Sequence, residues 1–77
     1  MSTQINLPAI PTERRILRLP QVEARTGFKH ARIYNLMKAG KFPQAIPLGV
    51  RAVGWDSVEV DQWIEDRRNE REQRAPV

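Results

Sequence analysis

The chain has 77 residues, a formal net charge of +4 at neutral pH and no cysteine. This length allows one domain with a small hydrophobic core, and the lack of cysteine excludes a disulfide framework and a thiolate metal site. No apolar run is long enough to span a bilayer, and the N-terminus lacks the pattern of a secretory signal, so we expect a cytoplasmic protein with no membrane partner.

Positive charge is concentrated in the first two thirds of the chain. Residues 14–55 carry nine basic side chains and one acidic one, whereas residues 56–77 carry four basic and seven acidic ones. A field this one-sided is expected of a protein that binds a polyanion such as nucleic acid. The alternative interpretation is that these basic side chains are simply solvated.

The start of the chain gives weak structural signals. Residues 1–13 contain two prolines and no hydrophobic periodicity, which predicts a flexible N-terminal tail. The segment 13–19 carries apolar side chains in an order that fits a short extended lead-in to the core. Arg14 and Arg15, near its beginning, are weak candidates for an arm that contacts DNA, and a disordered basic tail is the alternative.

A short helix follows this lead-in. Pro20 suits a helix start, where its missing N–H costs nothing, and Gly27 suits the sharp turn that ends the helix. These two residues predict a first helix over 20–25. We expect it to bury Val22 and Ala24.

A second helical pattern runs from Lys29 to Ala39, with Ile33, Leu36 and Met37 on its apolar face. Lys29 is a poor N-cap because its side chain has no acceptor oxygen, which leaves the N–H groups of the first turn free to take a phosphate. A boundary misplaced by a residue or two is the competing explanation. Two short helices joined by a tight turn are the outline of a helix-turn-helix.

The outer face of the second helix carries the candidate nucleic-acid contacts. At about 100° per residue, Ala31, Asn35 and Lys38 point away from the apolar face, and Arg32 and Tyr34 lie on its flanks. We expect bases to be read mainly by His30, Arg32 and Asn35, and phosphates to be held mainly by Lys29, Tyr34 and Lys38. For His30, which begins the helix, simple exposure to solvent is an equally good interpretation.

Two short β-prone runs, Ala45 to Leu48 and Ala52 to Trp55, predict a small hairpin. A hairpin directly after a recognition helix is a wing. Its turn, Gly49, Val50 and Arg51, supplies the candidate wing contacts, because Arg51 at the tip is placed to enter a minor groove or meet a phosphate. An ordinary exposed turn is the alternative.

The last helix has the clearest start. Asp56 and Glu59 have capping-box spacing, and Trp63 lies on the apolar stripe that follows. From Arg68 no apolar stripe remains, so we expect the helix to fray there. The sequence thus predicts three parts: a flexible tail over 1–13, a DNA-binding domain over 14–68 and a charged C-terminal tail over 69–77.

Catalytic groups do not converge in this sequence. His30 is the only histidine, which leaves no partner for a histidine metal site or for a nucleophile and histidine pair. The acids crowd into one terminal helix, where a solvated face is the simplest interpretation, and no phosphate-binding glycine loop is present. We therefore expect no enzyme, no cofactor, no metal and no small-molecule ligand.

Three segments, RILRLPQVEARTG, IYNLMKAGKFP and PLGVRAVGWDSVEVDQWIEDR, resemble the AlpA family of phage and prophage regulatory proteins. This family is related to the excisionases and to MerR-like proteins, and the resemblance covers roughly residues 15–68. It implies a mainly α winged helix-turn-helix with a small β-hairpin that binds double-stranded DNA. The implied roles are transcriptional regulation, for example of an integrase gene, and excisionase-type control of DNA recombination. The family usually has serine at Lys29 and small or hydroxyl residues around Ala31 and Arg32, so the target sequence does not carry over.

Two rival functions use the same scaffold. A phage DNA-packaging initiation subunit would need a long assembly segment after the domain, and only a short charged tail follows. A protein-binding adaptor or antirepressor would grip a protein with the winged domain instead of DNA. For a DNA-binding role we expect a homodimer or a cooperative array on repeated sites, because so small a domain covers a short half-site.

Overall fold

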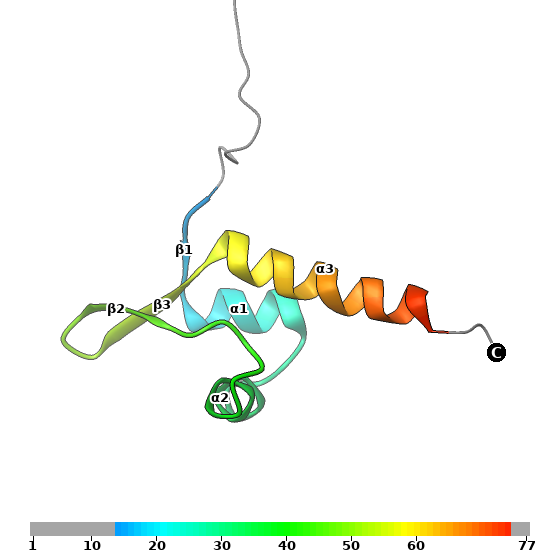
Figure 1. The fold of residues 1–77 in the computed structure, drawn as a ribbon. Helices are drawn as coiled ribbons and strands as arrows, with labels where there is room; N and C mark the ends of the chain where they lie inside the picture. Colours follow the sequence, from blue (N-terminus) through cyan, green and yellow to red (C-terminus); the bar gives the residue numbers. More distant parts are fainter. Residues whose placement is uncertain (1–13, 75–77) are drawn as a thin grey trace, which may run out of the picture.

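The computed structural model of the protein describes residues 14–74, which form three helices and a small sheet (Figure 1). The tail predicted over residues 1–13 lies outside the described residues. The elements follow the chain as β1 (Ile16–Leu17), α1 (Leu19–Thr26), α2 (His30–Lys38), β2 (Ile46–Gly49), β3 (Ala52–Asp56) and α3 (Ser57–Gln73).

Helix α1 begins one residue before the predicted start and ends at the predicted turn. The backbone N–H of Arg18 donates to Oε1 of Gln21 at 2.8 Å, which ties the chain entering the helix to its first turn. Gly27 has a φ of 78°, a left-handed conformation that glycine adopts without strain. Val22 is fully buried, but Ala24 is exposed, so the expectation that both are buried was wrong. Residues two apart lie on nearly opposite sides of a helix, and both cannot face one core.

Helix α2 matches its prediction closely. Lys29 precedes it with extended backbone angles, φ −88° and ψ 167°, and its side chain makes no capping hydrogen bond. The poor cap expected from the sequence is therefore present. Ile33 is fully buried, and Leu36 and Met37 are partly buried against the same core.

The three strands form an antiparallel sheet in the order β1, β3, β2. The predicted hairpin is present as β2 and β3, and it projects from the body of the molecule (Figure 1). Gly54 lies where β1 and β2 both approach β3. A Cβ atom there would come within 2.3 Å of Cγ2 of Ile16 and 2.9 Å of the carbonyl oxygen of Leu17, so only glycine fits this crossing.

One small core joins these elements. Its members come from β1, α1, α2, the segment after α2, β3 and α3, and they are Leu17, Val22, Ile33, Phe42, Trp55 and Val60. Because the helices and the sheet share this core, the position of α2 relative to the hairpin is fixed by packing. The architecture is a winged helix-turn-helix, mainly helical with a small β-hairpin.

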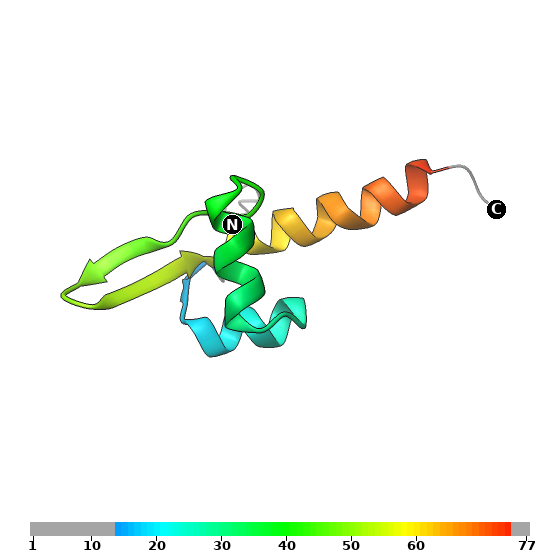
Figure 2. The same ribbon diagram turned by 90° about the horizontal axis from the view of Figure 1, so that it is seen from below.

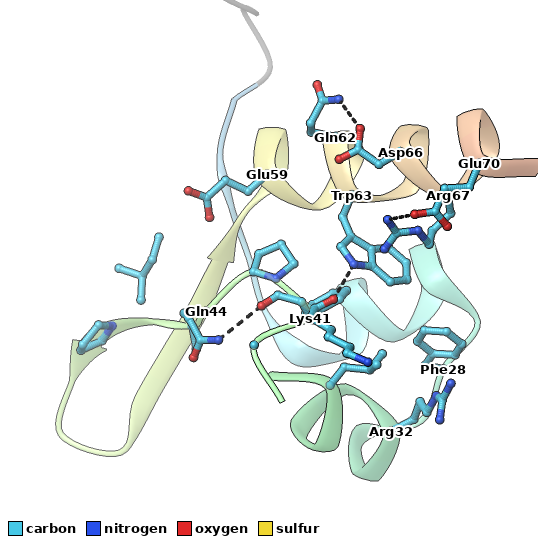
Figure 3. A pocket seen from close by; sticks show the side chains of 17 residues that line it. Phe28, Arg32, Lys41, Gln44, Glu59, Gln62, Trp63, Asp66, Arg67 and Glu70 are labelled. Atoms are coloured by element: carbon cyan, nitrogen blue, oxygen red, sulfur yellow. Dashed lines mark hydrogen bonds and ion pairs between the residues drawn. The ribbon is translucent and has the colours of Figure 1, made fainter. Parts of the chain in front are cut away.

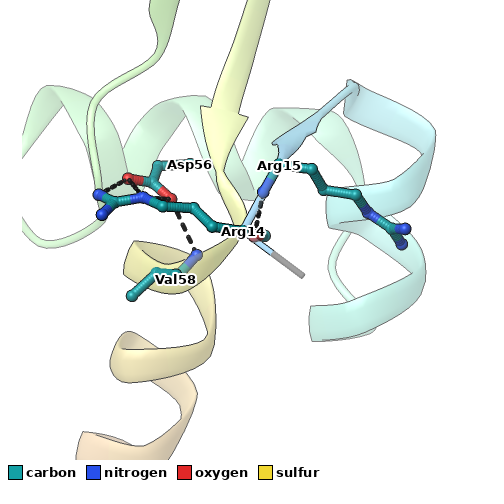
Figure 4. A network of polar contacts seen from close by, with 5 residues as sticks. Arg14, Arg15, Asp56 and Val58 are labelled. Atoms are coloured by element: carbon teal, nitrogen blue, oxygen red, sulfur yellow. Dashed lines mark hydrogen bonds and ion pairs between the residues drawn. The ribbon is translucent and has the colours of Figure 1, made fainter. Parts of the chain in front are cut away.

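The start of α3 is tied to the beginning of the described chain (Figure 4). The carboxylate of Asp56 accepts from the backbone N–H of Val58 at 2.9 Å and from Nε of Arg14 at 3.1 and 3.2 Å, and it also forms an ion pair with Arg14. The Arg14 guanidinium is the main reason that the pKa of Asp56 is lowered below its ordinary value of 3.8. This contact fixes β1 against the N-terminus of α3.

Helix α3 continues to Gln73, so the prediction that it frays from Arg68 was wrong. Ion pairs along its surface replace the missing apolar stripe. Arg68 contacts Glu65 and Glu72, and Arg67 contacts Glu70 at 2.7 Å. Pairs spaced three or four residues apart each add a few tenths of a kcal/mol to helix stability, roughly 0.2–0.5 kcal/mol.

Candidate nucleic-acid interface

Helix α2 lies on one outer side of the molecule, below α1 and α3 in Figure 1. Figure 2 views the molecule from below, and there α2 lies in front of the other helices with the hairpin extending to one side. All the candidate side chains of this helix are solvent-exposed: Lys29, His30, Ala31, Arg32, Tyr34, Asn35 and Lys38. The outer face predicted for this helix is thus open to a ligand.

Two aromatic contacts fix the flanks of α2. The guanidinium carbon of Arg32 lies 5.5 Å from the ring centre of Phe28, a cation–π contact. The ring of Tyr34 meets Trp55 edge to face at a centroid distance of 6.2 Å. Trp55 belongs to β3 and Phe28 to the turn before α2, so Arg32 and Tyr34 are held on different sides of the helix. Asn35 points outward between them.

An aromatic cluster supports the Arg32 flank (Figure 3). The ring of Trp63 meets Phe28 at 6.0 Å and Phe42 at 5.0 Å between centroids, and its Nε1–H donates to the carbonyl oxygen of Lys41 at 2.7 Å. Phe28 therefore anchors the start of α2 to α3, as expected for a residue that staples the helix to the core. The cluster lines a shallow groove between α3 and the segment that follows α2.

His30 lies at the end of α2 that is nearest to α1. Its Nδ1 is 3.8 Å from the carboxylate of Glu23, and its side chain is 68% exposed. The distance is long for a hydrogen bond, so the imidazole is available to a ligand. Its place at the start of the helix, beside Glu23 of α1, distinguishes it from Asn35, which lies in the middle of the outer face.

The hairpin tip exposes an apolar and a basic side chain together. Val50 is 92% exposed, far more than a β-branched residue in a folded domain usually is, and the next residue, Arg51, is also exposed. Arg51 adopts a left-handed φ of 61°, which costs a non-glycine residue on the order of 1 kcal/mol. Gly49 completes the turn at the end of β2.

Ion pairing separates the basic residues into two groups. Arg14, Arg25, Arg67 and Arg68 each contact a carboxylate on the α3 side of the molecule. Within residues 14–74, no such contact is made by the basic residues of the lead-in, α2, the wing and the segments that join them: Arg15, Arg18, Lys29, Arg32, Lys38, Lys41 and Arg51. Arg71 and Arg74, at the C-terminal end of α3, also have no carboxylate partner in this part of the chain, but the other unpaired cations lie on the lead-in, α2, the wing and the segments that join them.

The two predicted arm residues differ. The guanidinium of Arg14 forms an ion pair with Asp56 at the start of α3, so this residue has a structural contact, and its place in a DNA-binding arm stays a prediction. Arg15 uses its backbone, which exchanges hydrogen bonds with Ser57, and its side chain extends away from that network (Figure 4). Of these two residues, Arg15 is the one whose side chain has no carboxylate partner among residues 14–74.

Sequence reasoning gave no role to Arg18. Its Nε donates to the carbonyl oxygen of Val53 in β3 at 3.0 Å, and the residue is exposed. The signal that could have indicated it was its place in the positively charged block. The contact itself joins residues 35 apart in the chain and is invisible to local patterns.

Two searches of the described residues, 14–74, concern other kinds of site. No cluster of three or more histidine, aspartate and glutamate side chains is arranged there to hold a metal ion. None of the helices in this part of the chain has the length and apolar character needed to cross a membrane.

Comparisons with known proteins agree with this geometry. The family model described as prophage CP4-57 regulatory protein (AlpA) matches residues 15–68. The chain is 41% identical over 59 residues to the DNA-binding transcriptional activator AlpA of Escherichia coli K12, covering 69% of this chain and 84% of that protein. It is 39% identical over 61 residues to the uncharacterized protein ORF88 of Enterobacteria phage P4, covering 79% of this chain and 68% of that protein. The chain belongs to the AlpA family of prophage regulatory proteins.

Proposed function

We propose that the protein binds double-stranded DNA and regulates genes of a phage or prophage-like element. The observation that carries this proposal is the set of exposed cations on α2 and the wing that have no carboxylate partner among residues 14–74. Unpaired cations that bind phosphates release the counterions condensed on DNA, and this release favours binding. The relative from Escherichia coli, named a DNA-binding transcriptional activator, supports the same function.

In this proposal α2 enters the major groove. The groove is about 12 Å wide and a helix with its side chains is about 10–12 Å across, so the outward residues meet base edges and the flanking residues meet the groove walls. Asn35 is the principal base-reading residue, since an amide can bond adenine through two atoms. Arg32, held beside Phe28, reads a base edge next to Asn35, and Tyr34, held beside Trp55 on the other flank, reaches a wall of the groove. Lys38 adds charge beside them.

The wing reaches the DNA next to the recognition helix. Arg51 supplies the charge for a phosphate or a narrow minor groove, and the exposed Val50 supplies apolar contact with sugars. The strained φ of Arg51 is consistent with a turn kept for binding, because strain of this kind clusters at functional sites.

The biological role within this proposal is regulatory, not catalytic. Control of transcription, for example of an integrase gene, is the first role, and control of excision as a recombination directionality factor is the second. Both require several copies on one DNA site, as a homodimer or a cooperative array, because one small domain reads only a few base pairs.

The test is a fluorescence anisotropy titration of the protein with duplex DNA recovered by selection from a random library. We expect Asn35→Ala to cost about 1–3 kcal/mol on the selected duplex and to relax its preference at one position. Lys38→Ala weakens all duplexes alike and lowers the salt slope by about one. An affinity that hardly varies with salt would contradict the proposal and would favour the protein-binding adaptor.

A further inference from the structure

Arg18 occupies the junction between β1 and α1, and its guanidinium is fixed to the wing. Strand β1 pairs only with Trp55 and Asp56 of β3, so it has ended before Val53. The carbonyl oxygen of Val53 is instead bonded by Nε of Arg18 at 3.0 Å. The side chain of Arg18 thus bonds to β3 just beyond the point where β1 ends, and it ties the N-terminus of α1 to the middle of the hairpin.

The junction of β1 and α1 lies behind α2, on the same side of the molecule as the wing. In Figure 1 the junction of β1 and α1 and the hairpin both lie above α2, and in Figure 2 the junction lies beside α2 on its hairpin side. A duplex that takes α2 into its major groove presents its sugar-phosphate backbone to elements placed in this way. In a helix-turn-helix it is the first helix that crosses the backbone.

The chemistry of Arg18 suits a phosphate. A guanidinium carries five N–H donors, and one of them is used by Val53, which holds the group without neutralising it. Arg18 is exposed and forms no ion pair with any acid among residues 14–74. A held guanidinium with free donors can bind two oxygens of one phosphate, and less side-chain entropy is lost than for a free arginine.

From these observations we infer that Arg18 is a DNA phosphate contact between the recognition helix and the wing, and that it also positions the wing. This inference rests on the proposed function, because it assumes that the ligand is duplex DNA. It adds a contact from the start of α1 to those of α2 and the hairpin. The side chain of Arg18 then both binds the DNA backbone and positions the wing.

Arg25 provides a matched control, because Arg18 directly precedes α1 and Arg25 lies within it. It lies near the other end of α1 and forms an ion pair with Asp61 of α3. Removing either guanidinium removes one positive charge from α1 or the residue before it. Only the loss at Arg18 removes an unpaired charge beside the wing.

The experiment measures the affinity of the full chain for a random-sequence 20-base-pair duplex across a range of KCl concentrations. Arg18→Gln keeps a hydrogen-bond donor for Val53 but loses the charge, so the slope of log affinity against log salt falls by about 0.9. Arg25→Gln leaves the slope as in the wild type. Arg18→Lys keeps the charge and therefore restores the slope.

Thermal unfolding of each variant separates binding from folding. A role for Arg18 in folding alone would lower the melting temperature of Arg18→Gln and leave its salt slope unchanged, which would overturn the inference. Equal slope losses in Arg18→Gln and Arg25→Gln would also overturn it, because the position of the charge would then be irrelevant. A wild-type affinity without salt dependence would instead overturn the proposed function itself.

Discussion

Helices α2 and α3 differ in whether their exposed basic side chains are paired with carboxylates. In α3, Arg67 and Arg68 pair with glutamates of the same helix, and Asp61 pairs with Arg25 of α1. In α2, no arginine or lysine has a carboxylate partner among residues 14–74. Surface pairing therefore stabilises one helix and leaves the other with charge to offer a ligand. Part of this difference is already present in the sequence, because α2 contains no acidic residue and α3 contains six.

The most direct test of this difference reverses charges on α2 and the wing in one variant and on α3 in another. Lys38→Glu together with Arg51→Glu removes two phosphate contacts and adds repulsion, and we expect the affinity for duplex DNA to fall about 100-fold or more at low salt. The measurement is fluorescence anisotropy. The control is Arg68→Glu together with Arg71→Glu, which changes the net charge equally on α3. A similar loss in both double variants would show that net charge, not its location, decides binding.

The second prediction concerns the electrostatic contact that starts α3. Asp56→Asn keeps an acceptor for Val58 but loses the charge that meets Arg14, so the free energy of unfolding at neutral pH should fall, by a modest amount because Arg14 is exposed to solvent. Since the pKa of Asp56 is lowered in the folded state, its contribution is complete above about pH 4–5 and is lost as pH falls through the folded value, below 3.8. Urea unfolding at several pH values measures this. A difference between wild type and variant that persists undiminished at pH 2 would contradict it.

The third prediction, with the smallest expected effect, concerns the flank of α2 that carries Arg32. Phe28→Leu keeps an apolar side chain at the turn but removes the ring under Arg32, so we expect a loss of about 0.5–1 kcal/mol in DNA binding. In the Arg32→Ala background the same substitution should add almost nothing, because the ring acts through the guanidinium. Binding titrations of the four proteins of this cycle test the coupling. Additive losses would mean that Phe28 serves only the aromatic cluster with Trp63.

The parts of the fold that were predicted correctly are those governed by neighbouring residues. The uncapped start of α2 at Lys29, the left-handed turn at Gly27 and the hairpin tip at Arg51 each follow from the preferences of one or two residues. The apolar face of α2 followed from its helical period, with Ile33 buried as expected.

The parts that were missed depend on contacts between distant segments. Arg14 and Asp56 are 42 residues apart, and Arg18 and Val53 are 35 apart, so no local pattern indicates either pair. The length of α3 was underestimated because its last turns lack an apolar stripe and depend on pairs such as Arg68 with Glu65. For the candidate site, the sequence predicted which residues face outward. It could not show which arginines form ion pairs with carboxylates.

The most direct test of this account is the mapping of backbone amide chemical shifts in the ¹⁵N-labelled protein while duplex DNA is added. We expect the largest shifts in α2, at the wing tip around Val50 and Arg51, and at Arg18, with little change in the second half of α3. Shifts concentrated along α3 and in the groove beside Trp63, with α2 unaffected, would contradict the account.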